Sequence, residues 1–292
     1  MNRRTFVGKA ALAGLGTFAF GKVSAAGKPD GREITVFTKS LEKLSFDELA
    51  EAIAPLGVAG LEAPLRKGGH IQPEEMADKL PAFVAALAKR NLKVVVMASS
   101  ISRADKLAET QLRAAKAAGI TRYRLEHLKY DLSKPIAPQL ANFKAQLTDL
   151  AAMNAEIGVQ GLYQNHRGNN FVGGPIWDMV GMIEDIDVKH LGLAFDFAHA
   201  TVEGANAWEM NFSRAMPHIG AICYKDYRLE GKTWNPCPIG EGCVNAKSGK
   251  LVAKLPPEVP IAIHIEYVKA GDVAKTVEAM KNDLATVRKW LG

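Results

Sequence analysis

Short apolar runs alternate with longer amphipathic stretches along most of the chain. The runs have the length of buried strands and lie at residues 33–37, 58–63, 92–98, 122–126, 159–165, 191–196, 219–226 and 261–267. The stretches between them have the apolar spacing that is typical of helices, at 45–57, 72–91, 103–119, 138–158, 175–186, 206–216 and 272–292. The pattern therefore predicts eight strand–helix units, of which one lacks its helix.

The interruption is the connection between the last two predicted strands, residues 228–258, which is rich in glycine and proline. Elsewhere local signals support the helices: Ser45, with Glu48 three residues later, predicts a capping box, and Gly57 marks the end of that helix. Eight such units within about 250 residues predict a single-domain α/β fold, the (β/α)8 TIM barrel. A doubly wound open sheet is the alternative, but no Gly-x-Gly-x-x-Gly motif follows a predicted strand and there is no P-loop.

The first 26 residues differ from the rest of the chain. A basic head with Arg3 and Arg4 precedes a short apolar stretch and small residues at 24–26. This order predicts a cleavable export signal over residues 1–26 and a barrel domain over residues 27–292, with an amphipathic N-terminal helix as the alternative. The adjacent arginines resemble the twin-arginine signal, which implies export of the folded protein by the twin-arginine machinery to the periplasm or the medium.

The net charge and the cysteine content limit the binding partners and metal sites that are expected. The predicted signal carries four basic residues and no acidic one, so its removal lowers the formal net charge from +6 to +2. Without a basic stripe interleaved with aromatic residues, or an apolar run of about 18 residues, neither nucleic acid nor a stable membrane anchor is expected. Cys223, Cys237 and Cys243 form no Cys-x-x-Cys pair, so a structural zinc site is not expected, and a Cys237–Cys243 bridge stays open.

Several predicted strands end in charged or polar residues, as in the stretch LAFDFAHA, which contains Asp196. Alternate residues of a barrel strand face the lumen and the helices, so the small residues on the face of Asp196 place its side chain in the lumen. The same argument places Glu266, Lys225, Gln164 and Glu62 on inward faces. These positions lie at the carboxyl ends of the strands, where the active sites of TIM barrels are found.

Histidines gather at the same end of the predicted barrel. Five of the seven lie at or just after the end of a predicted strand: His70, His127, His166, His199 and His264. Carboxylates and imidazoles that converge in one cavity predict a divalent metal site, with Mn, Mg, Zn or Co as candidates, and supply acid–base groups. Trp234, in the long connection, is a candidate for stacking on a substrate. The structural alternatives are that Asp196 caps a helix or pairs with an arginine, and that Glu62 orients Arg66 or Arg124.

Six stretches together resemble the xylose isomerase-like barrels, a family of sugar and sugar phosphate isomerases and epimerases. The resemblance covers about residues 33–290, and the stretches read VAGLEAPLRKGGHIQPEE, LYQNHRGNNFVGGPIWD, LAFDFAHATVEG, CYKDYR, PIGEGCV and IHIEY. It implies a TIM barrel that holds one divalent metal through a Glu on strand five, an Asp on strand six, a His on strand seven and a Glu on strand eight. The form YQNH also looks like exported relatives proposed to act on 3-keto-glycosides.

Two of these four positions match and two depart. Asp196 and Glu266 match the Asp and the second Glu, whereas Gln164 replaces the first Glu and Cys223 replaces the His. The resemblance also implies that His199, three residues after the metal Asp, contacts the substrate. Because the Gln164 side chain cannot take up a proton, the two-carboxylate scheme of the family's epimerases is in doubt here.

These observations predict an exported, metal-assisted isomerase or epimerase that acts on a keto sugar or sugar derivative through an enediolate. The predicted metal ligands are Asp196, Glu266 and Gln164; the predicted proton-transfer residues are Glu266, His166 and Lys225; the predicted substrate-binding residues are His199, Arg66, Arg228, Glu62, Trp234 and His264. Arg228 belongs to this set because it falls near a substrate-binding arginine of the family.

There are three alternative functions. Loss of a β-substituent after the same proton abstraction gives a lyase, or a hydrolase of 3-keto-glycosides. The departures at Gln164 and Cys223 favour a catalytically silent sugar-binding barrel. A metal nuclease of the related barrel type requires more ligands and a basic groove, which the small charge of the mature chain disfavours. The substrate, the metal and the formation of a homo-oligomer stay open.

Overall fold

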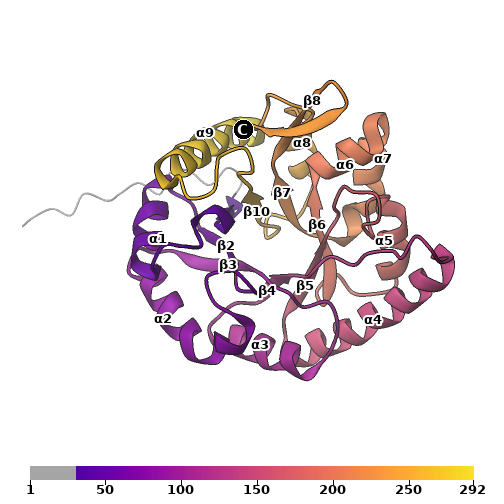
Figure 1. Cartoon of the computed structure of the whole chain (residues 1–292), viewed down its shortest axis with the longest axis horizontal. Helices are drawn as coiled ribbons and strands as arrows, with labels where there is room; N and C mark the ends of the chain where they lie inside the picture. The colour runs from indigo at the N-terminus through magenta and orange to yellow at the C-terminus, as the bar shows by residue number, and fades with distance from the viewer. Residues whose placement is uncertain (1–30) are drawn as a thin grey trace, which may run out of the picture.

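Eight parallel strands close into a barrel with helices around it (Figure 1). The computed structural model describes residues 31–292, so the predicted export signal lies outside the described residues. The barrel strands are β1 (Ile34–Phe37), β2 (Gly60–Pro64), β3 (Lys93–Ala98), β4 (Arg122–Arg124), β5 (Gln160–Gln164), β6 (Leu191–Asp196), β7 (Ile219–Tyr224) and β10 (Ile261–Ile263). β1 pairs with both β2 and β10, which closes the cylinder. The predicted single-domain TIM barrel is confirmed, and the open-sheet alternative is wrong.

The helices form a ring outside the strands (Figure 1). They are α1 (Phe46–Ile53), α2 (Met76–Ala88), α3 (Lys106–Ala117), α4 (Ile136–Ile157), α5 (Ile176–Ile183), α6 (Phe197–Gly204), α7 (Trp208–Ala215), α8 (Lys247–Val252) and α9 (Val273–Leu291). The capping box predicted for α1 is present: Ser45 Oγ accepts a hydrogen bond from the Glu48 backbone N–H, and Glu48 Oε2 accepts one from the Ser45 backbone N–H. Among the described helices, none has both the length and the apolar character needed to cross a membrane.

The alternation along each strand separates two packing layers. Leu193 and Phe195 of β6 face outward and belong to the large core between the barrel and the helices. Leu162, Ala194 and Ala221 face inward and form, with Cys223, a separate small cluster in the lumen. The predicted inward and outward faces are therefore confirmed for these strands.

The connection between β7 and β10 is more regular than the sequence pattern predicts. It contains an antiparallel hairpin, β8 (Asp226–Glu230) and β9 (Thr233–Cys237), and the short helix α8. Gly231, with a φ of 62°, lies in the turn of the hairpin, where a left-handed backbone favours glycine. Most hairpin residues are exposed or half-buried, so the apolar alternation that reveals a buried strand is missing. The three cysteines described are free.

Asp226 holds the next part of this connection in place. Its buried carboxylate accepts hydrogen bonds from the backbone N–H groups of Tyr227, Gly240, Gly242 and Val244, at 2.8 to 3.0 Å. One side chain therefore fixes the loop that contains the stretch PIGEGCV.

Candidate active site

The carboxyl ends of β6, β7 and β10 bring together four polar side chains, which we call the rim cluster: Asp196, Lys225, Tyr227 and Glu266. The three strands are neighbours, with β7 in the middle. Lys225, directly after β7, therefore reaches carboxylates on both sides: its Nζ lies 3.3 Å from Asp196 Oδ2 and 3.0 Å from Glu266 Oε1. The Tyr227 hydroxyl donates a hydrogen bond of 2.6 Å to Glu266 Oε2. The two carboxylates thus converge on one cation, the ammonium group of Lys225.

Charge pairing keeps Glu266 and Lys225 of the rim cluster ionised. Burial raises the pKa of Glu266, but Lys225 and the Tyr227 hydroxyl outweigh this effect, so the pKa falls to about 2. Burial lowers the pKa of Lys225, but Asp196 and Glu266 hold it above its ordinary value. Lys225 is buried, whereas the Glu266 side chain is 38% exposed. Glu266 is therefore the more exposed member of the pair.

A second group of charges, which we call the deep cluster, consists of Glu62 on β2, Arg124 on β4 and His264 after β10. Arg124 Nε lies 2.5 Å from Glu62 Oε1, His264 Nε2 lies 2.7 Å from Glu62 Oε2, and no side chain of the three is more than 4% exposed. Burial raises the pKa of Glu62, but Arg124 and His264 outweigh this effect and hold the pKa well below its usual range. Glu62 and His264, which the sequence predicts to bind substrate, instead contact each other, and Glu62 orients Arg124.

Gln164 links the two clusters through its side-chain amide. Its Oε1 accepts a hydrogen bond of 2.9 Å from Arg124 Nη1, and its Nε2 donates one of 2.8 Å to Asp196 Oδ2. Because a guanidinium group only donates, the contact with Arg124 turns the N–H side of the amide toward Asp196. Asn165 pairs with the backbone N–H and C=O of the same aspartate, at 2.8 and 3.1 Å. Both the side chain and the backbone of Asp196 are thereby fixed.

Asp196 also begins helix α6. Its Oδ1 accepts a hydrogen bond of 3.0 Å from the backbone N–H of His199, as an N-cap does. The alternative in which Asp196 caps a helix is therefore also present in the structure. His199, which the resemblance implies in substrate binding, lies in the first turn of α6 as a result.

Three histidines, which we call the histidine row, lie in ring contact with one another: His127, His166 and His199. Their ring centroids are 4.6 Å apart between the first two and 4.0 Å apart between the last two. His199 is fully buried with no hydrogen-bond partner on either ring nitrogen, and Nε2 of His127 has none either. Buried polar atoms without partners are rare in proteins, which makes these nitrogens candidate contacts for a ligand.

Burial keeps the histidine row uncharged. It lowers the pKa of His166 to about 3, and it lowers the pKa values of His199 and His127 below their ordinary value. His166 Nδ1 lies 2.8 Å from the backbone carbonyl oxygen of Arg167, which only accepts, so Nδ1 carries the proton. Nε2 of His166 therefore carries a lone pair and can accept a proton.

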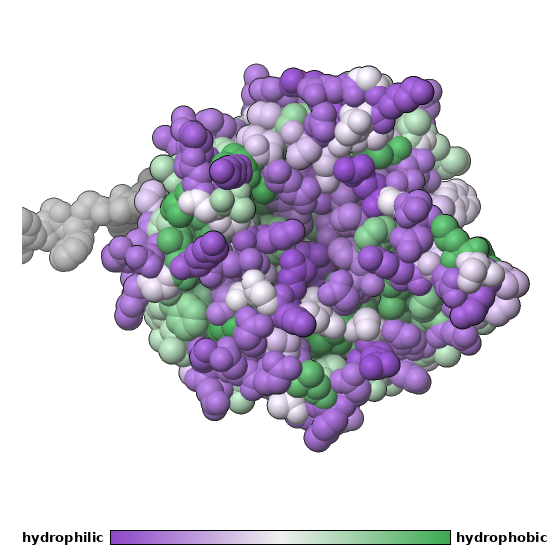
Figure 2. All heavy atoms as spheres, viewed as in Figure 1, coloured by the Kyte–Doolittle hydropathy of each residue, from purple (hydrophilic) through white to green (hydrophobic). Residues whose placement is uncertain are grey.

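Two members of the rim cluster, Tyr227 and Glu266, and one of the histidine row, His166, line a single cavity of about 620 Å³, together with Phe37 and Arg167. A cavity of this size suits a small-molecule ligand. Figure 2 shows hydrophilic residues gathered over the middle of the barrel. The Arg167 guanidinium lies 4.6 Å from the centroid of the Tyr227 ring, so it borders the same space.

Three other predicted residues differ in how close they come to this cavity. Arg66 follows β2, and its guanidinium carbon lies 5.9 Å from the ring centroid of Phe37, a lining residue. Trp234 is half-buried on β9, and only its backbone carbonyl contacts the site, accepting a hydrogen bond of 3.4 Å from Arg167. Arg228 is exposed on β8, and its Nη2 lies 2.7 Å from Glu241 Oε2. The structure therefore does not bring Arg228 to the cavity.

The sequence prediction missed Tyr227 and Arg167. Tyr227 lies two residues after Lys225, and this spacing puts both on one face of an extended segment, so alternation continued past β7 predicts it. Arg167 lies in the loop after β5, where no periodicity applies, and only the fold places it over Tyr227.

The predicted metal ligands Asp196, Glu266 and Gln164 are neighbours of Lys225, but in this arrangement they do not fit a divalent cation. The ammonium group of Lys225 takes the place between the two carboxylates. Gln164 turns its N–H side to Asp196, and an N–H group cannot ligate a metal.

One other group of side chains lies close enough together to share a metal ion. Among residues 31–292, the His, Cys, Asp and Glu side chains with ligand atoms close enough for a shared ion are Glu62, Cys223 and His264, within 4.8 Å of one another. The guanidinium of Arg124 already contacts Glu62, and burial raises the pKa of the Cys223 thiol well above its ordinary value. A neighbouring cation and a protonated thiol make this group a poor site for a divalent ion.

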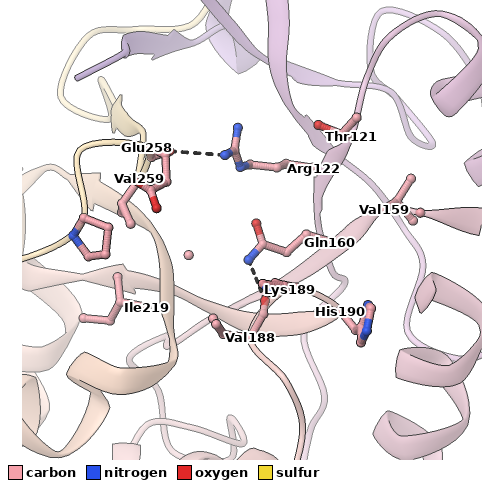
Figure 3. Close-up of a pocket in the computed structure, with 13 residues that line it drawn as sticks. Thr121, Arg122, Val159, Gln160, Val188, Lys189, His190, Ile219, Glu258 and Val259 are labelled. Atoms are coloured by element: carbon pink, nitrogen blue, oxygen red, sulfur yellow. Dashed lines mark hydrogen bonds between the residues drawn. The ribbon is translucent and has the colours of Figure 1, made fainter. Parts of the chain in front are cut away.

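A second cavity, of about 490 Å³, lies at the amino ends of the strands (Figure 3). His190 lines it, as expected for a histidine that precedes a strand. Its Arg122 donates a hydrogen bond to the backbone carbonyl of Glu258, and its Gln160 donates one to that of Val188 (Figure 3). These side chains stabilise the backbone, so the chemistry lies at the opposite end.

The sequence matches the model of the xylose isomerase-like TIM barrel family over residues 50–255. No curated protein sequence matches the chain. Among solved structures, 3-keto-D-glucoside 4-epimerase from E. coli in its apo form has a TM-score of 0.67 at 15% identity, over 88% of this chain and 99% of that chain. D-psicose 3-epimerase in the presence of D-fructose has a TM-score of 0.67 at 15% identity, over 89% and 99%. The probable 3-DHS dehydratase from Bacillus anthracis has a TM-score of 0.63 at 15% identity, over 87% and 97%.

Two other similar structures contain metal ions. A xylose isomerase-like TIM barrel protein from Mycobacterium smegmatis was solved with magnesium, and the IOLI protein was solved with zinc. Their TM-scores are 0.63 and 0.65, at 13% and 12% identity. At such identities the similarity shows the shared fold.

Proposed function

Because this chain belongs to the xylose isomerase-like TIM barrel family, we propose that it is a sugar isomerase or epimerase acting on a keto sugar or sugar derivative. The observation that carries the proposal is one cavity lined by two proton-accepting groups, the Glu266 carboxylate and the His166 imidazole. Proteins of the same fold that epimerise a 3-keto-D-glucoside and D-psicose support the substrate class.

Glu266 and His166 reach the cavity from different sides, because β7 and β6 separate β10 from β5 around the barrel. Both are unprotonated at neutral pH, with pKa values of about 2 and about 3. A carbon bound between them loses a proton to one group, and the other group, once it has taken a proton from water, delivers it to the opposite face, which inverts the carbon and gives epimerisation. Return of the proton to the neighbouring carbon gives isomerisation.

In this proposal, polar groups that lack a hydrogen-bond partner within the protein help to hold the substrate. The three ring nitrogens of His199 and His127 that lack partners take hydrogen bonds from or to sugar hydroxyl groups. Arg66 and Arg167 border the cavity and supply further donors. The enediolate that forms also requires a positive charge beside its oxygen, and in this chain Lys225 is the cation already present between the two carboxylates.

Isotope exchange tests the proposal. The mature protein is incubated in heavy water with keto-glycosides and free ketoses, and deuterium uptake at carbon is followed by NMR and mass spectrometry. Uptake at a carbon next to the carbonyl is expected, with a fall of about 100-fold or more in Glu266→Gln and His166→Gln, because each loses its proton acceptor. His190→Gln, in the cavity at the opposite end, is the matched control and is expected to retain full exchange.

The products distinguish the alternatives. Release of a substituent together with exchange identifies a lyase or a hydrolase of 3-keto-glycosides. A sugar that raises the melting temperature without any deuterium uptake identifies a silent sugar-binding barrel, and this result contradicts the proposed activity.

We also propose that residues 1–26 export the folded enzyme by the twin-arginine route to the periplasm or the medium. The paired Arg3 and Arg4 before a short apolar stretch support this proposal. Replacing both arginines by lysine is expected to retain the protein, with its signal uncleaved, in the cytoplasm, as cell fractionation will show.

A further inference from the structure

Lys225 takes the position between the two carboxylates of the rim cluster. It follows the middle one of three neighbouring strands, and its Nζ contacts Asp196 on one side and Glu266 on the other, at 3.3 and 3.0 Å. Only 4% of its side chain is exposed. An ammonium group buried between two carboxylates is fully compensated in charge, whereas one moved aside into the packed surroundings would lose both partners.

The hydrogen bonds around Asp196 suit an ammonium group rather than a metal ion. Its Oδ1 accepts from the backbone N–H of His199, and its Oδ2 accepts from both Gln164 and Lys225. The amide of Gln164 cannot turn its oxygen to this point without breaking its hydrogen bond with Arg124. The three groups that contact the carboxylate at hydrogen-bonding distance are all donors, and His199 Nε2 lies farther away, at 3.8 Å from Oδ2.

Glu266 shows the same arrangement on the other side of Lys225. Its Oε1 faces the ammonium group, and its Oε2 accepts a hydrogen bond from Tyr227. Cys223, opposite Asp196 in the register of β6 and β7, adds a buried thiol, whereas a metal ion binds the thiolate.

We propose that Lys225 is the resident cation of this site, so that its ammonium group, rather than a divalent metal ion, stabilises the oxyanion formed on the substrate. This inference rests on the proposed proton-transfer function. An ammonium group has three N–H donors, and two of them are directed at Asp196 and Glu266. The third meets the substrate carbonyl oxygen, which becomes the enediolate oxyanion as the proton leaves the carbon.

Metal content and metal response of the wild-type protein give the first test. The mature protein is purified without chelator and analysed by mass spectrometry for bound metals, and its melting temperature is measured with EDTA and with millimolar Mn²⁺, Mg²⁺, Zn²⁺ and Co²⁺. We expect far less than one equivalent of metal, and melting temperatures within about 1 °C of one another. One tightly bound equivalent, or a rise of several degrees with one ion, overturns the inference.

Removal of the ammonium group gives the second test. Lys225→Met leaves two facing carboxylates, so we expect this variant to gain a rise in melting temperature with Mn²⁺ or Mg²⁺ that the wild type lacks. Deuterium exchange is expected to fall by about 100-fold or more, the usual effect of removing one oxyanion donor. Gln164→Glu combined with Lys225→Met adds a third carboxylate and is expected to bind the ions more tightly. The absence of any metal response in both variants overturns the inference.

Two further variants control for charge and folding. Lys247→Met removes an exposed lysine that pairs with Glu209 at 2.6 Å, and it is expected to change neither metal response nor exchange. Lys225→Arg keeps a cation between the carboxylates, so it is expected to fold and to remain without a metal response even where Lys225→Met fails to fold. A metal response in Lys225→Arg contradicts the inference.

The two proposals fail in different ways. If no keto sugar undergoes exchange, the proposed function fails, while the metal measurements still decide which cation the site holds. If exchange occurs only after a metal is added, the function stands and the role of Lys225 as resident cation is wrong.

Discussion

The deep cluster and the rim cluster are built from the same kinds of group but differ in what they leave open. In the deep cluster, Glu62 uses both carboxylate oxygens on Arg124 and His264, and all three side chains are buried. In the rim cluster, Glu266 is partly exposed to a cavity. A closed set of charges stabilises the barrel, whereas a set with one accessible carboxylate can do chemistry.

A third buried carboxylate shows what the cations contribute. Asp283 on α9 accepts a hydrogen bond of 3.1 Å from the Ile239 backbone N–H but has no ion pair among the described residues. Burial raises its pKa to about 7, with smaller contributions from Asp226 and Glu241. A buried carboxylate with a cation partner stays charged, and one without a cation partner holds its proton to a higher pH.

The largest effect is expected from breaking the deep cluster. Glu62→Ala leaves the guanidinium of Arg124 buried without its carboxylate, so the free energy of unfolding is expected to fall by about 3–5 kcal/mol. Urea unfolding of the purified variant measures this loss. Glu62→Gln loses the charge but keeps the shape and a hydrogen-bond acceptor, so it is expected to lose less; a full loss in Glu62→Ala with none in Glu62→Gln would show that packing, not charge, is responsible.

A pH-dependent effect is expected at Asp283. Between about pH 4 and pH 7 the folded protein keeps the Asp283 proton while the unfolded chain loses it, so this group lowers stability as pH rises and its full cost is present above pH 7. Asp283→Asn removes the cost, so its stability relative to wild type is expected to be greater at pH 8 than at pH 5, by about 3 kcal/mol. Glu278→Gln, an exposed change on the same helix, is the control, and identical pH profiles for Asp283→Asn and wild type contradict the assignment.

A smaller effect on activity is expected at the rim cluster. Tyr227→Phe removes the hydroxyl group that donates to Glu266 but keeps the ring, so deuterium exchange is expected to fall about 10-fold while the fold is retained. Tyr123→Phe removes a buried hydroxyl bonded to Asn154, and is expected to affect stability without changing exchange. If both variants exchange at the wild-type rate, the Tyr227 hydroxyl has no part in the reaction.

The smallest effect is expected at Arg228. Its ion pair with Glu241 is exposed, and such pairs contribute about 0–1 kcal/mol. Arg228→Ala is therefore expected to lower the free energy of unfolding by less than about 1 kcal/mol and to change kcat/KM by less than about twofold. Steady-state kinetics with the substrate found by isotope exchange measures it. A loss of tenfold or more would show that Arg228 swings into the cavity when substrate binds, as the family resemblance implies.

The sequence predicts the barrel well because its signal is periodic. Most barrel strands are short apolar runs, and alternation within β6 correctly separates Leu193 and Phe195 from Ala194. The hairpin of β8 and β9 escapes prediction because it lies against the barrel rim instead of inside a core, so its residues follow no apolar period.

The roles of the site residues are harder to predict. Alternation along a strand shows which way a side chain faces, but not how deep in the barrel it lies. Glu62 and Glu266 are both inward-facing acids near strand ends, yet one is enclosed by Arg124 and His264 while the other borders the cavity. Which side chains pair with one another also depends on the arrangement of three strands. That Lys225 reaches between Asp196 and Glu266 depends on the order β6, β7 and β10 around the barrel, which no local stretch contains.

The Asp196 carboxylate has two roles, which limits the residues that can replace it. One oxygen begins helix α6 and the other faces Lys225, so the length of the side chain and its charge are both required. Asparagine retains the length but gives up the attraction to the ammonium group, and glutamate retains the attraction but is one methylene too long to begin the helix in the same way. A substitution of Asp196 would therefore disturb both the start of helix α6 and the charge balance around Lys225.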